Sequence, residues 1–339
     1  MKRFAIWALA LGLALQARAG EIEDLKGRAP LAPAAVQPSP PPTSPRGAAV
    51  DKPSAEGLRP LNIYFISVGQ GDAEYIELPD GDNALIDGGP DPAALGSFLQ
   101  RHNVSRIGHV VLTHPHSDHY NGLNYVFDSI EVGAFYDTRM DNTGATGDEK
   151  VRAKAERAAR DGVSYPRPGE GLDWGAGVAV KVFNSCPDEV RSTTVDDRGQ
   201  DVNDCSIVLK LTAEGRSALL EGDVQADVEA RMVEDYGDEL RADILKVAHH
   251  GSAYSSTDDF LAKVKPRWAV IGVGKNNYGH PTQAALTRLE HAGAEVFRTD
   301  QDGDVSGSDF VEKLLAKRLG GWDPSPEPGA AAADYVTLR

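Results

Sequence analysis

Two observations in the sequence predict an α/β fold. Short apolar stretches typical of strands alternate with stretches typical of helices in both halves of the region 61–317. Histidine, aspartate and other polar residues gather directly after several of the apolar stretches. Because the loops at strand ends carry the functional groups in α/β proteins, we expect one site built from several such loops.

In the first half, turns rich in Gly, Pro and Asp separate the expected elements, as at Pro79-Asp80-Gly81-Asp82. The expected strands are 61–68, 74–78, 83–86 and 109–113. The expected helices are 92–102, a segment beginning near Gly122, and a charged helix at 148–161. The charged helix has a weak apolar face, so we interpret it as a solvated surface helix and assign it no chemistry.

In the second half, 178–186 and 205–211 are apolar enough for strands, and the polar loop between them is typical of a hairpin. The other expected strands are 217–220, 243–248, 268–273 and 295–298, and the expected helices are 227–236, 260–264 and 282–292. Cys186 and Cys205 would lie near the open end of the hairpin. In an exported chain this arrangement favours a disulfide over two buried thiols.

Both ends of the chain differ from the middle in composition. Residues 1–19 combine a basic start, an apolar run and the small-x-small sequence Ala17-Arg18-Ala19, which predicts a cleavable signal peptide and a periplasmic or secreted protein. An uncleaved N-terminal anchor is the alternative, and we expect no other membrane-spanning segment. Residues 20–60 form a Pro/Ala-rich linker, 61–317 the folded domain, and 318–339 a low-complexity tail.

The formal net charge of −16 excludes a broad basic surface for nucleic acid. The predicted leader contains Lys2, Arg3 and Arg18 and no acidic residue, so its removal makes the mature chain still more acidic. A small anionic substrate fits this charge better than a long nucleic acid does.

The run HPHSDH, from His114 to His119, is the strongest functional signal. It contains three imidazoles and one carboxylate, which are preferred ligands of divalent metals. Its spacing lets His114 and His116 face one ion, while Asp118 and His119 turn toward a second. A polar loop that happens to be rich in histidine is the alternative, but only nine histidines occur in 339 residues, so a chance cluster of three is improbable.

Three further polar clusters follow later strands. They are Asp223 in EGD, His249 and His250 in HHGS, and His280 in YGHP. Taken alone, Asp223 fits a helix cap, and each histidine fits an ordinary loop residue. Their occurrence together, in this order after HPHSDH, predicts one site.

These motifs, with the early turns VGQGDA and LIDGG, resemble the metallo-β-lactamase fold. The similarity is specific to the branch at the C-terminus of the ComEC competence channel protein, a DNA-uptake permease. It covers about 61–305 and implies an αββα sandwich with a hydrolytic site for one or two metals at one edge. Zn²⁺ is the first candidate ion and Mn²⁺ the second.

The resemblance implies roles for individual residues. His114 and His116 would bind the first metal, Asp118 and His119 the second, and Asp223 would bridge both. One further ligand would come from HHGS or GHP, and we favour His249. His250 and His280 would then support a ligand, contact the substrate or donate a proton.

Between His119 and His249 the sequence contains no histidine, although the wider fold usually supplies one there to the first metal. Asn203 or Asp204 is the nearest substitute, which leaves the metal stoichiometry open. Asp118 would orient or deprotonate the attacking water. Ser206, Ser252 and Lys275 are candidate oxyanion contacts, with structural roles as the alternative.

The resulting hypothesis is an exported metal-dependent hydrolase, a phosphodiesterase or nuclease that acts through a metal-bound hydroxide. Its expected partner is a phosphodiester or another small anion, and DNA is a second candidate that rests on the resemblance. Lactone, thioester or β-lactam hydrolysis is the first alternative. A non-catalytic binding module is the second, and the intact HPHSDH and Asp223 weigh against it.

Overall fold

The computed structural model describes residues 57–138, 140–143, 146–186, 194–196 and 200–310. These residues belong to one of the two units into which the chain divides, Lys52–Arg339. The predicted leader and tail lie outside the described residues, as does the predicted linker except for its last four residues. The bounds given for those segments therefore stay predictions. No helix in the described part of the chain is long and apolar enough to cross a membrane.

Two seven-stranded sheets form the middle layers of this unit, as far as the structure describes it. The first sheet contains, in spatial order, β16 (Val305–Ser306), β1 (Asn62–Phe65), β2 (Glu74–Glu77), β3 (Asn83–Ile86), β4 (Arg106–Val111), β5 (Glu131–Tyr136) and β7 (Ala159–Ser164). The second contains β15 (Glu295–Arg298), β14 (Trp268–Ile271), β13 (Ile244–Lys246), β12 (Arg216–Leu220), β11 (Val208–Ala213), β9 (Ala179–Asn184) and β8 (Gly171–Leu172). The short strands β6 (Asp141–Thr143) and β10 (Thr194–Asp196) pair with each other.

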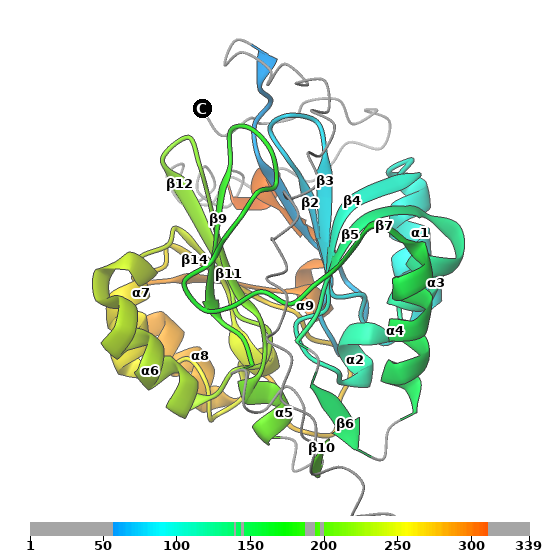
Figure 1. Cartoon of the computed structure of the whole chain (residues 1–339). Helices are drawn as coiled ribbons and strands as arrows, with labels where there is room; N and C mark the ends of the chain where they lie inside the picture. Colours follow the sequence, from blue (N-terminus) through cyan, green and yellow to red (C-terminus); the bar gives the residue numbers. More distant parts are fainter. Residues whose placement is uncertain (1–56, 139, 144–145, 187–193, 197–199, 311–339) are drawn as a thin grey trace, which may run out of the picture. The chain divides into compact units, whose positions relative to one another are not determined.

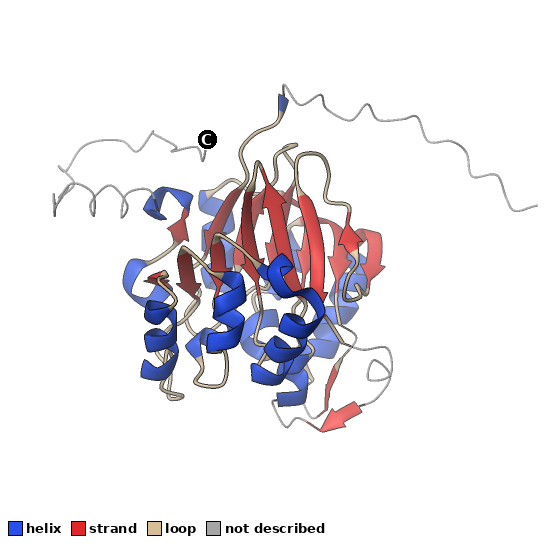
Figure 2. Cartoon of the chain, turned by 90° about the vertical axis from the view of Figure 1, so that its left-hand side faces the viewer, coloured by secondary structure: helices blue, strands red, loops and turns tan. Residues whose placement is uncertain are grey.

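Helices cover the outer face of each sheet (Figure 1). On the first sheet lie α1 (Pro92–Arg101), α3 (Leu123–Ser129) and α4 (Gly147–Ala158), and on the second lie α6 (Ala226–Tyr236), α7 (Asp258–Val264) and α8 (Gln283–His291). Figure 2 shows helices in front of the strands on the side of the second sheet. Connections contain α2 (Ser117–Tyr120), α5 (Gln200–Asp204), η3 (Gly237–Leu240), η4 (Ala248–Gly251) and α9 (Thr299–Asp302). The four layers confirm the predicted αββα sandwich.

The period-two alternation of the strands explains the layers. In β14, Trp268 and Val270 point into the core between the two sheets, whereas Ala269 and Ile271 pack against the outer helices. The same alternation in β3 sends Ala84 inward between the sheets. Successive side chains of a strand point to opposite faces, so strands that are apolar on both faces need cover on both faces.

Parallel pairing brings the polar loops to common edges of the two sheets. In the first sheet β3, β4 and β5 are parallel neighbours, and Val111 pairs with both Ile86 and Tyr136. In the second sheet β12, β13, β14 and β15 are parallel neighbours, and Lys246 pairs with both Leu220 and Val270. The carboxyl ends of parallel strands lie at one edge, so the loops after β4, β12, β13 and β14 can meet.

Three strands of the first sheet, β5, β7 and β16, have no counterpart among the predicted elements. The edge strand β7 is largely exposed, so its sequence lacks the apolar pattern that identifies a strand. The predicted charged helix therefore ends early, at Ala158, where the chain enters β7. Within α4 the buried Val151 and Ala155 pack on the first sheet, and Arg152 donates to Asp137. The helix is thus half-buried and more than a solvated surface element.

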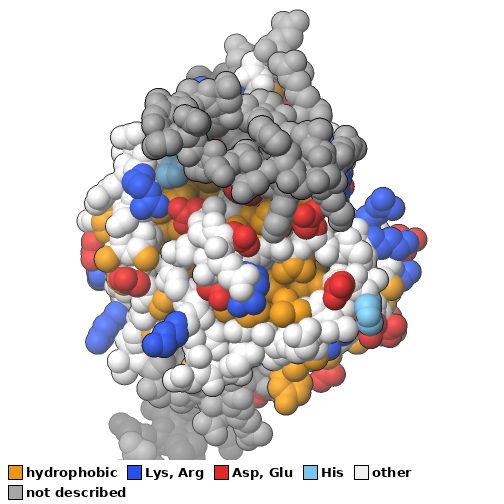
Figure 3. All heavy atoms as spheres, turned by 180° about the vertical axis from the view of Figure 1, so that it is seen from behind, with side chains coloured by type: hydrophobic (Ala, Val, Ile, Leu, Met, Phe, Trp, Pro, Cys, Tyr) orange, Lys and Arg blue, Asp and Glu red, His pale blue; other side chains and the backbone are white. Residues whose placement is uncertain are grey.

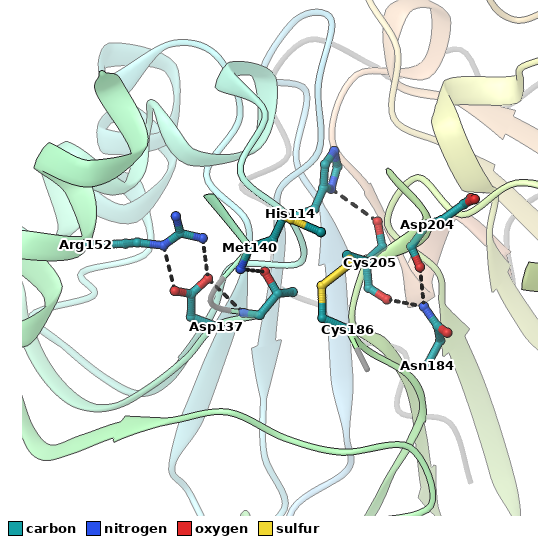
Figure 4. Close-up of a disulfide and its surroundings, with 10 residues drawn as sticks. His114, Asp137, Met140, Arg152, Asn184, Cys186, Asp204 and Cys205 are labelled. Carbon is teal, nitrogen blue, oxygen red and sulfur yellow. Dashed lines mark hydrogen bonds and ion pairs between the residues drawn. A yellow bond between two sulfur atoms is a disulfide. The ribbon is translucent and has the colours of Figure 1, made fainter. Parts of the chain in front are cut away.

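Cys186 and Cys205 form a disulfide, as predicted, with Cα atoms 4.4 Å apart. The predicted antiparallel pairing is also confirmed by β9 and β11, but the two cysteines flank the segment that joins these strands, so they lie at the loop end of the hairpin and not at its open end. Both sulfurs are buried in a small cluster with Met140 and Val202. Ser206, the neighbour of Cys205 in the sequence, lies with its hydroxyl 3.3 Å from Nδ1 of His114, so the disulfide fixes the chain close to the HPHSDH motif (Figure 4).

Replacing both cysteines by serine should lower the free energy of unfolding by about 3 kcal/mol, because the disulfide closes a loop with a sequence separation of 19 residues. Guanidinium titrations of the wild type and the Cys186→Ser/Cys205→Ser variant measure this difference, and the wild type under reducing conditions is the control. Two free thiols in the denatured, unreduced wild type would contradict the disulfide.

Candidate metal site

The HPHSDH motif follows β4 directly and enters the short helix α2. His114 and His119 are fully buried, whereas the side chain of Asp118 is 31% exposed. Nδ1 of His114 lies 3.1 Å from the Thr113 hydroxyl, so its Nε2 is directed toward the other histidines. That Nε2 lies 3.0 Å from Nδ1 of His116. Burial, together with the charge of His119, holds the pKa of His114 well below its usual range, which favours the neutral form that ligates metals.

Asp87, the residue that follows β3, fixes the orientation of the motif. Its Oδ1 accepts the Thr113 amide at 2.8 Å, and its Oδ2 accepts the Thr113 hydroxyl at 2.6 Å. The same Oδ2 lies 2.7 Å from Nδ1 of His119. An imidazole held at one nitrogen by a carboxylate presents its other nitrogen to a metal in a fixed direction. Asp87 therefore supports His119, a role that the sequence reasoning missed.

Asp223 lies where three histidines converge. Its Oδ2 lies 3.4 Å from Nε2 of His119, 3.5 Å from Nε2 of His250 and 3.8 Å from Nε2 of His114. Burial alone would raise the pKa of this carboxyl, but the charges of His250 and His119 outweigh burial and hold it well below the usual range. The ionised carboxylate is the form that binds a metal.

Two small residues let the loop that contains Asp223 approach the three histidines closely. Ser206, which follows Cys205, accepts the Asp223 amide at 3.0 Å, and its hydroxyl lies 3.3 Å from Nδ1 of His114. Gly222 has a φ of 57°, and a Cβ there would lie 2.9 Å from the Cβ of Ser206. Both the left-handed backbone and the close approach require glycine. Ser206 is fully buried, and its hydroxyl thus positions both Asp223 and His114.

His250 reaches the same point from η4. Its Nδ1 donates to the Gly272 carbonyl at 2.8 Å, so its Nε2 faces the carboxylates of Asp223 and Asp118, the latter at 3.3 Å. Burial lowers the pKa of His250, but Asp223 and Asp72 outweigh burial and raise it to about 10. Carboxylates that stabilise a proton here also stabilise a metal cation in its place.

Asp72 and Lys246 form a buried ion pair beside these ligands. Asp72 Oδ1 lies 3.4 Å from Nδ1 of His250, and the Lys246 ammonium also donates to the Gly222 carbonyl at 3.2 Å. The pair joins a loop of the first half to β13 of the second sheet. Neither residue was predicted as part of the site. The sequence signals are that Asp72 lies in the Gly-rich turn before β2 and that Lys246 interrupts an apolar strand.

The site fits a divalent metal by its donors. One ligand atom from each of Asp72, His119, Asp223 and His250 lies within 4.8 Å of the other three. Nε2 of His119, Nε2 of His250 and Oδ1 of Asp223 are buried without a hydrogen-bond partner among the described residues. Ligand atoms at about 2.0–2.2 Å from a tetrahedral ion lie about 3.3–3.6 Å apart. This range matches the 3.4 and 3.5 Å that separate Asp223 Oδ2 from Nε2 of His119 and of His250. Oδ2 of Asp72 pairs with Lys246, and Oδ2 of Asp118 lies 3.3 Å from Nε2 of His250, so Asp118 is a second candidate for the fourth ligand.

The remaining predicted residues lie around this group. His249 is half-buried, with its ring 6.3 Å from that of His250 and 5.4 Å from that of His280. The structure thus places His250, in preference to the favoured His249, among the four close ligands. Burial, then the charges of His249 and His250, lower the pKa of His280 to about 4.

The other predicted residues differ in exposure. Ser252 is buried, whereas Lys275 is exposed. The Oδ1 atoms of Asn203 and Asp204 have no hydrogen-bond partner among the described residues.

Comparisons with known proteins point to one family. Residues 66–199 match the family model described as Metallo-beta-lactamase superfamily. ComE operon protein 3 of Bacillus subtilis (strain 168) is 28% identical over 272 residues, which are 74% of this chain and 33% of that protein. Competence protein ComA of Neisseria gonorrhoeae is 31% identical over 226 residues, or 65% of this chain and 28% of that protein. The chain therefore spans about a third of the length of these relatives.

Among solved structures, the metallo-beta-lactamase fold protein YhfI of Bacillus subtilis is similar, with a TM-score of 0.48 at 11% identity. The match covers 73% of this chain and 99% of that chain.

Proposed function

The chain has the metallo-β-lactamase fold, and we propose that it is a metal-dependent hydrolase that cleaves phosphodiester bonds. The observation that carries the proposal is the convergence of the Nε2 atoms of His119 and His250 on the buried Asp223 carboxylate, with the Asp118 carboxylate 3.3 Å from Nε2 of His250. Asp118, His119, Asp223 and His250 would hold one divalent ion, Zn²⁺ or Mn²⁺. His114 and His116 would hold a second ion together with Asp223.

A divalent ion in such a site polarises a phosphoryl oxygen and lowers the pKa of a coordinated water. The protein's own groups supply orientation. Asp118 is partly exposed, whereas His119, Asp223 and His250 are buried, so it faces the side from which water and substrate arrive. Its carboxylate would accept a hydrogen bond from the attacking water. His249 and His280 are half-buried beside it and would contact the substrate.

Charge favours a short or single-stranded substrate. The chain carries a formal net charge of −16, and on the face in Figure 3 the Lys and Arg side chains are scattered among acidic ones and form no stripe. Duplex binding depends on phosphate contacts from clustered basic residues. The similarity to Competence protein ComA favours DNA fragments among the phosphodiesters, as does the resemblance of the motifs to the DNA-uptake branch of the fold.

We also propose that the protein is exported. The basic and apolar leader at 1–19 supports export, and so does the disulfide, because disulfides persist in oxidising compartments.

A substrate panel tests the proposed activity. Purified protein reloaded with Zn²⁺ or Mn²⁺ is given bis-p-nitrophenyl phosphate, a single-stranded oligonucleotide, nitrocefin and a lactone. Phosphodiester cleavage that a chelator abolishes is the expected result. Turnover of nitrocefin or lactone without phosphodiester cleavage would replace the proposal by the other hydrolase class, and failure to bind either metal would exclude both.

A further inference from the structure

Two tyrosines at the rim of the site are exposed in a way that needs an explanation. Tyr254 is 72% and Tyr278 is 75% exposed, and no other large hydrophobic side chain in the described part of the chain is classed with them. Both lie in loops that carry site histidines: Tyr254 follows η4 with His249 and His250, and Tyr278 precedes His280. Aromatic rings usually bury most of their surface. Their exposure in the loops that carry the site histidines points to contact with a substrate.

The backbone holds both rings in place. Oδ1 of Asn276 accepts the amides of Tyr278, Gly279 and His280 at 3.0–3.1 Å. Around the other tyrosine, the Tyr254 carbonyl accepts the Ala226 amide at 2.9 Å, and the guanidinium of Arg288 donates to carbonyls on either side. Each ring is therefore presented to solvent by a hydrogen-bonded loop.

A series of ring contacts leads from Tyr278 at the surface to the candidate ligands. The two loops touch, because the Thr282 amide donates to the Gly251 carbonyl at 2.9 Å. The ring of Tyr278 lies 5.9 Å from that of His280, which lies 5.4 Å from that of His249. The ring of His249 lies 6.3 Å from that of His250. A substrate whose phosphate reaches the ligands thus extends past His280 toward Tyr278.

We propose that Tyr278 and Tyr254 form a stacking subsite for unpaired nucleobases next to the phosphodiester that is cleaved. The inference rests on the proposed function and deepens it, because it assigns the residues that would hold a base beside the cleaved bond. A base stacks on a tyrosine without sequence preference, and it must be unpaired to do so. Lys275, exposed in the same loop as Tyr278, is placed to contact a neighbouring phosphate. Stacking would supply affinity that this acidic chain does not gain from a basic groove.

The test compares binding of two ligands that share a deoxyribose 5-phosphate and contain no phosphodiester to cleave, one with a base at C1′ and the other with a hydroxyl there. Thymidine 5′-monophosphate and 2-deoxyribose 5-phosphate are titrated into the metal-loaded protein by calorimetry. The expected result is tighter binding of the nucleotide by about fivefold to 150-fold. Tyr278→Ala and Tyr254→Ala should each reduce this preference, whereas Tyr278→Phe and Tyr254→Phe, which keep the ring, should retain it.

Equal affinity of the wild type for the two ligands, or an unchanged preference in both alanine variants, would overturn the subsite. The outcome is independent of the proposed activity. A base preference without cleavage of bis-p-nitrophenyl phosphate keeps the subsite and rejects the phosphodiesterase, whereas cleavage without a base preference does the reverse.

Discussion

Asp223→Asn is expected to remove bound metal and to lower phosphodiester cleavage on the order of a thousandfold, since a catalytic metal supplies several kcal/mol of stabilisation. Oδ2 of Asp223 lies within 3.8 Å of Nε2 of His114, His119 and His250, so both candidate ion positions depend on it. The amide keeps the size of the side chain but removes its charge, which leaves three imidazoles facing a neutral group.

Metal content after gel filtration and the rate on bis-p-nitrophenyl phosphate measure the effect. Asp227→Asn is the matched control, because Asp227 is exposed in the first turn of α6, four residues from Asp223. The control should keep both metal and rate, and circular dichroism of both variants checks the fold. An Asp223→Asn protein that retains its metal at wild-type occupancy would show that the ligands lie elsewhere.

Much of the fold was predictable because its layers follow from strand periodicity. Strands β3 and β15 occupy the predicted residues 83–86 and 295–298. The strands that the apolar pattern did not predict are held in the sheet by backbone pairing. The edge strand β7 exposes most of its side chains, so only its hydrogen bonds to β5 identify it as a strand.

The site was predictable where its residues cluster in the sequence, and less so where single residues come together through the fold. His114 and His119 share one motif, whereas Asp72 and Lys246 are 174 positions apart and meet as a buried ion pair. A lysine within the apolar strand β13 gives no sign of its partner. Asp87 was overlooked for a related reason: its contact with His119 exists only because β3 and β4 are parallel neighbours.

The choice between adjacent histidines could not be made from sequence, since His249 and His250 share one motif. Both adopt left-handed backbone, with φ of 50° and 53°, a conformation uncommon for residues other than glycine. This turn directs His250 inward, where the Gly272 carbonyl accepts from its Nδ1 and its Nε2 faces Asp223. His249 remains half-buried, and its ring lies beside that of His280. The two side chains therefore have different surroundings and separable roles.

His250→Ala is accordingly expected to weaken metal binding by at least about 100-fold. Loss of a residue that only supports a ligand weakens metal binding by about 10-fold to 100-fold, so a larger loss identifies His250 as a ligand. His249→Ala should change metal affinity by less than about tenfold and act mainly on the KM for the substrate, because its ring borders the route from Tyr278. Competition with a chromophoric chelator measures the metal affinity of both variants. They are matched, because each removes one imidazole and the two positions are adjacent in the sequence. If His249→Ala loses the metal and His250→Ala keeps it, the ligand assignment is reversed, and the inward turn of His250 serves the fold rather than the ion.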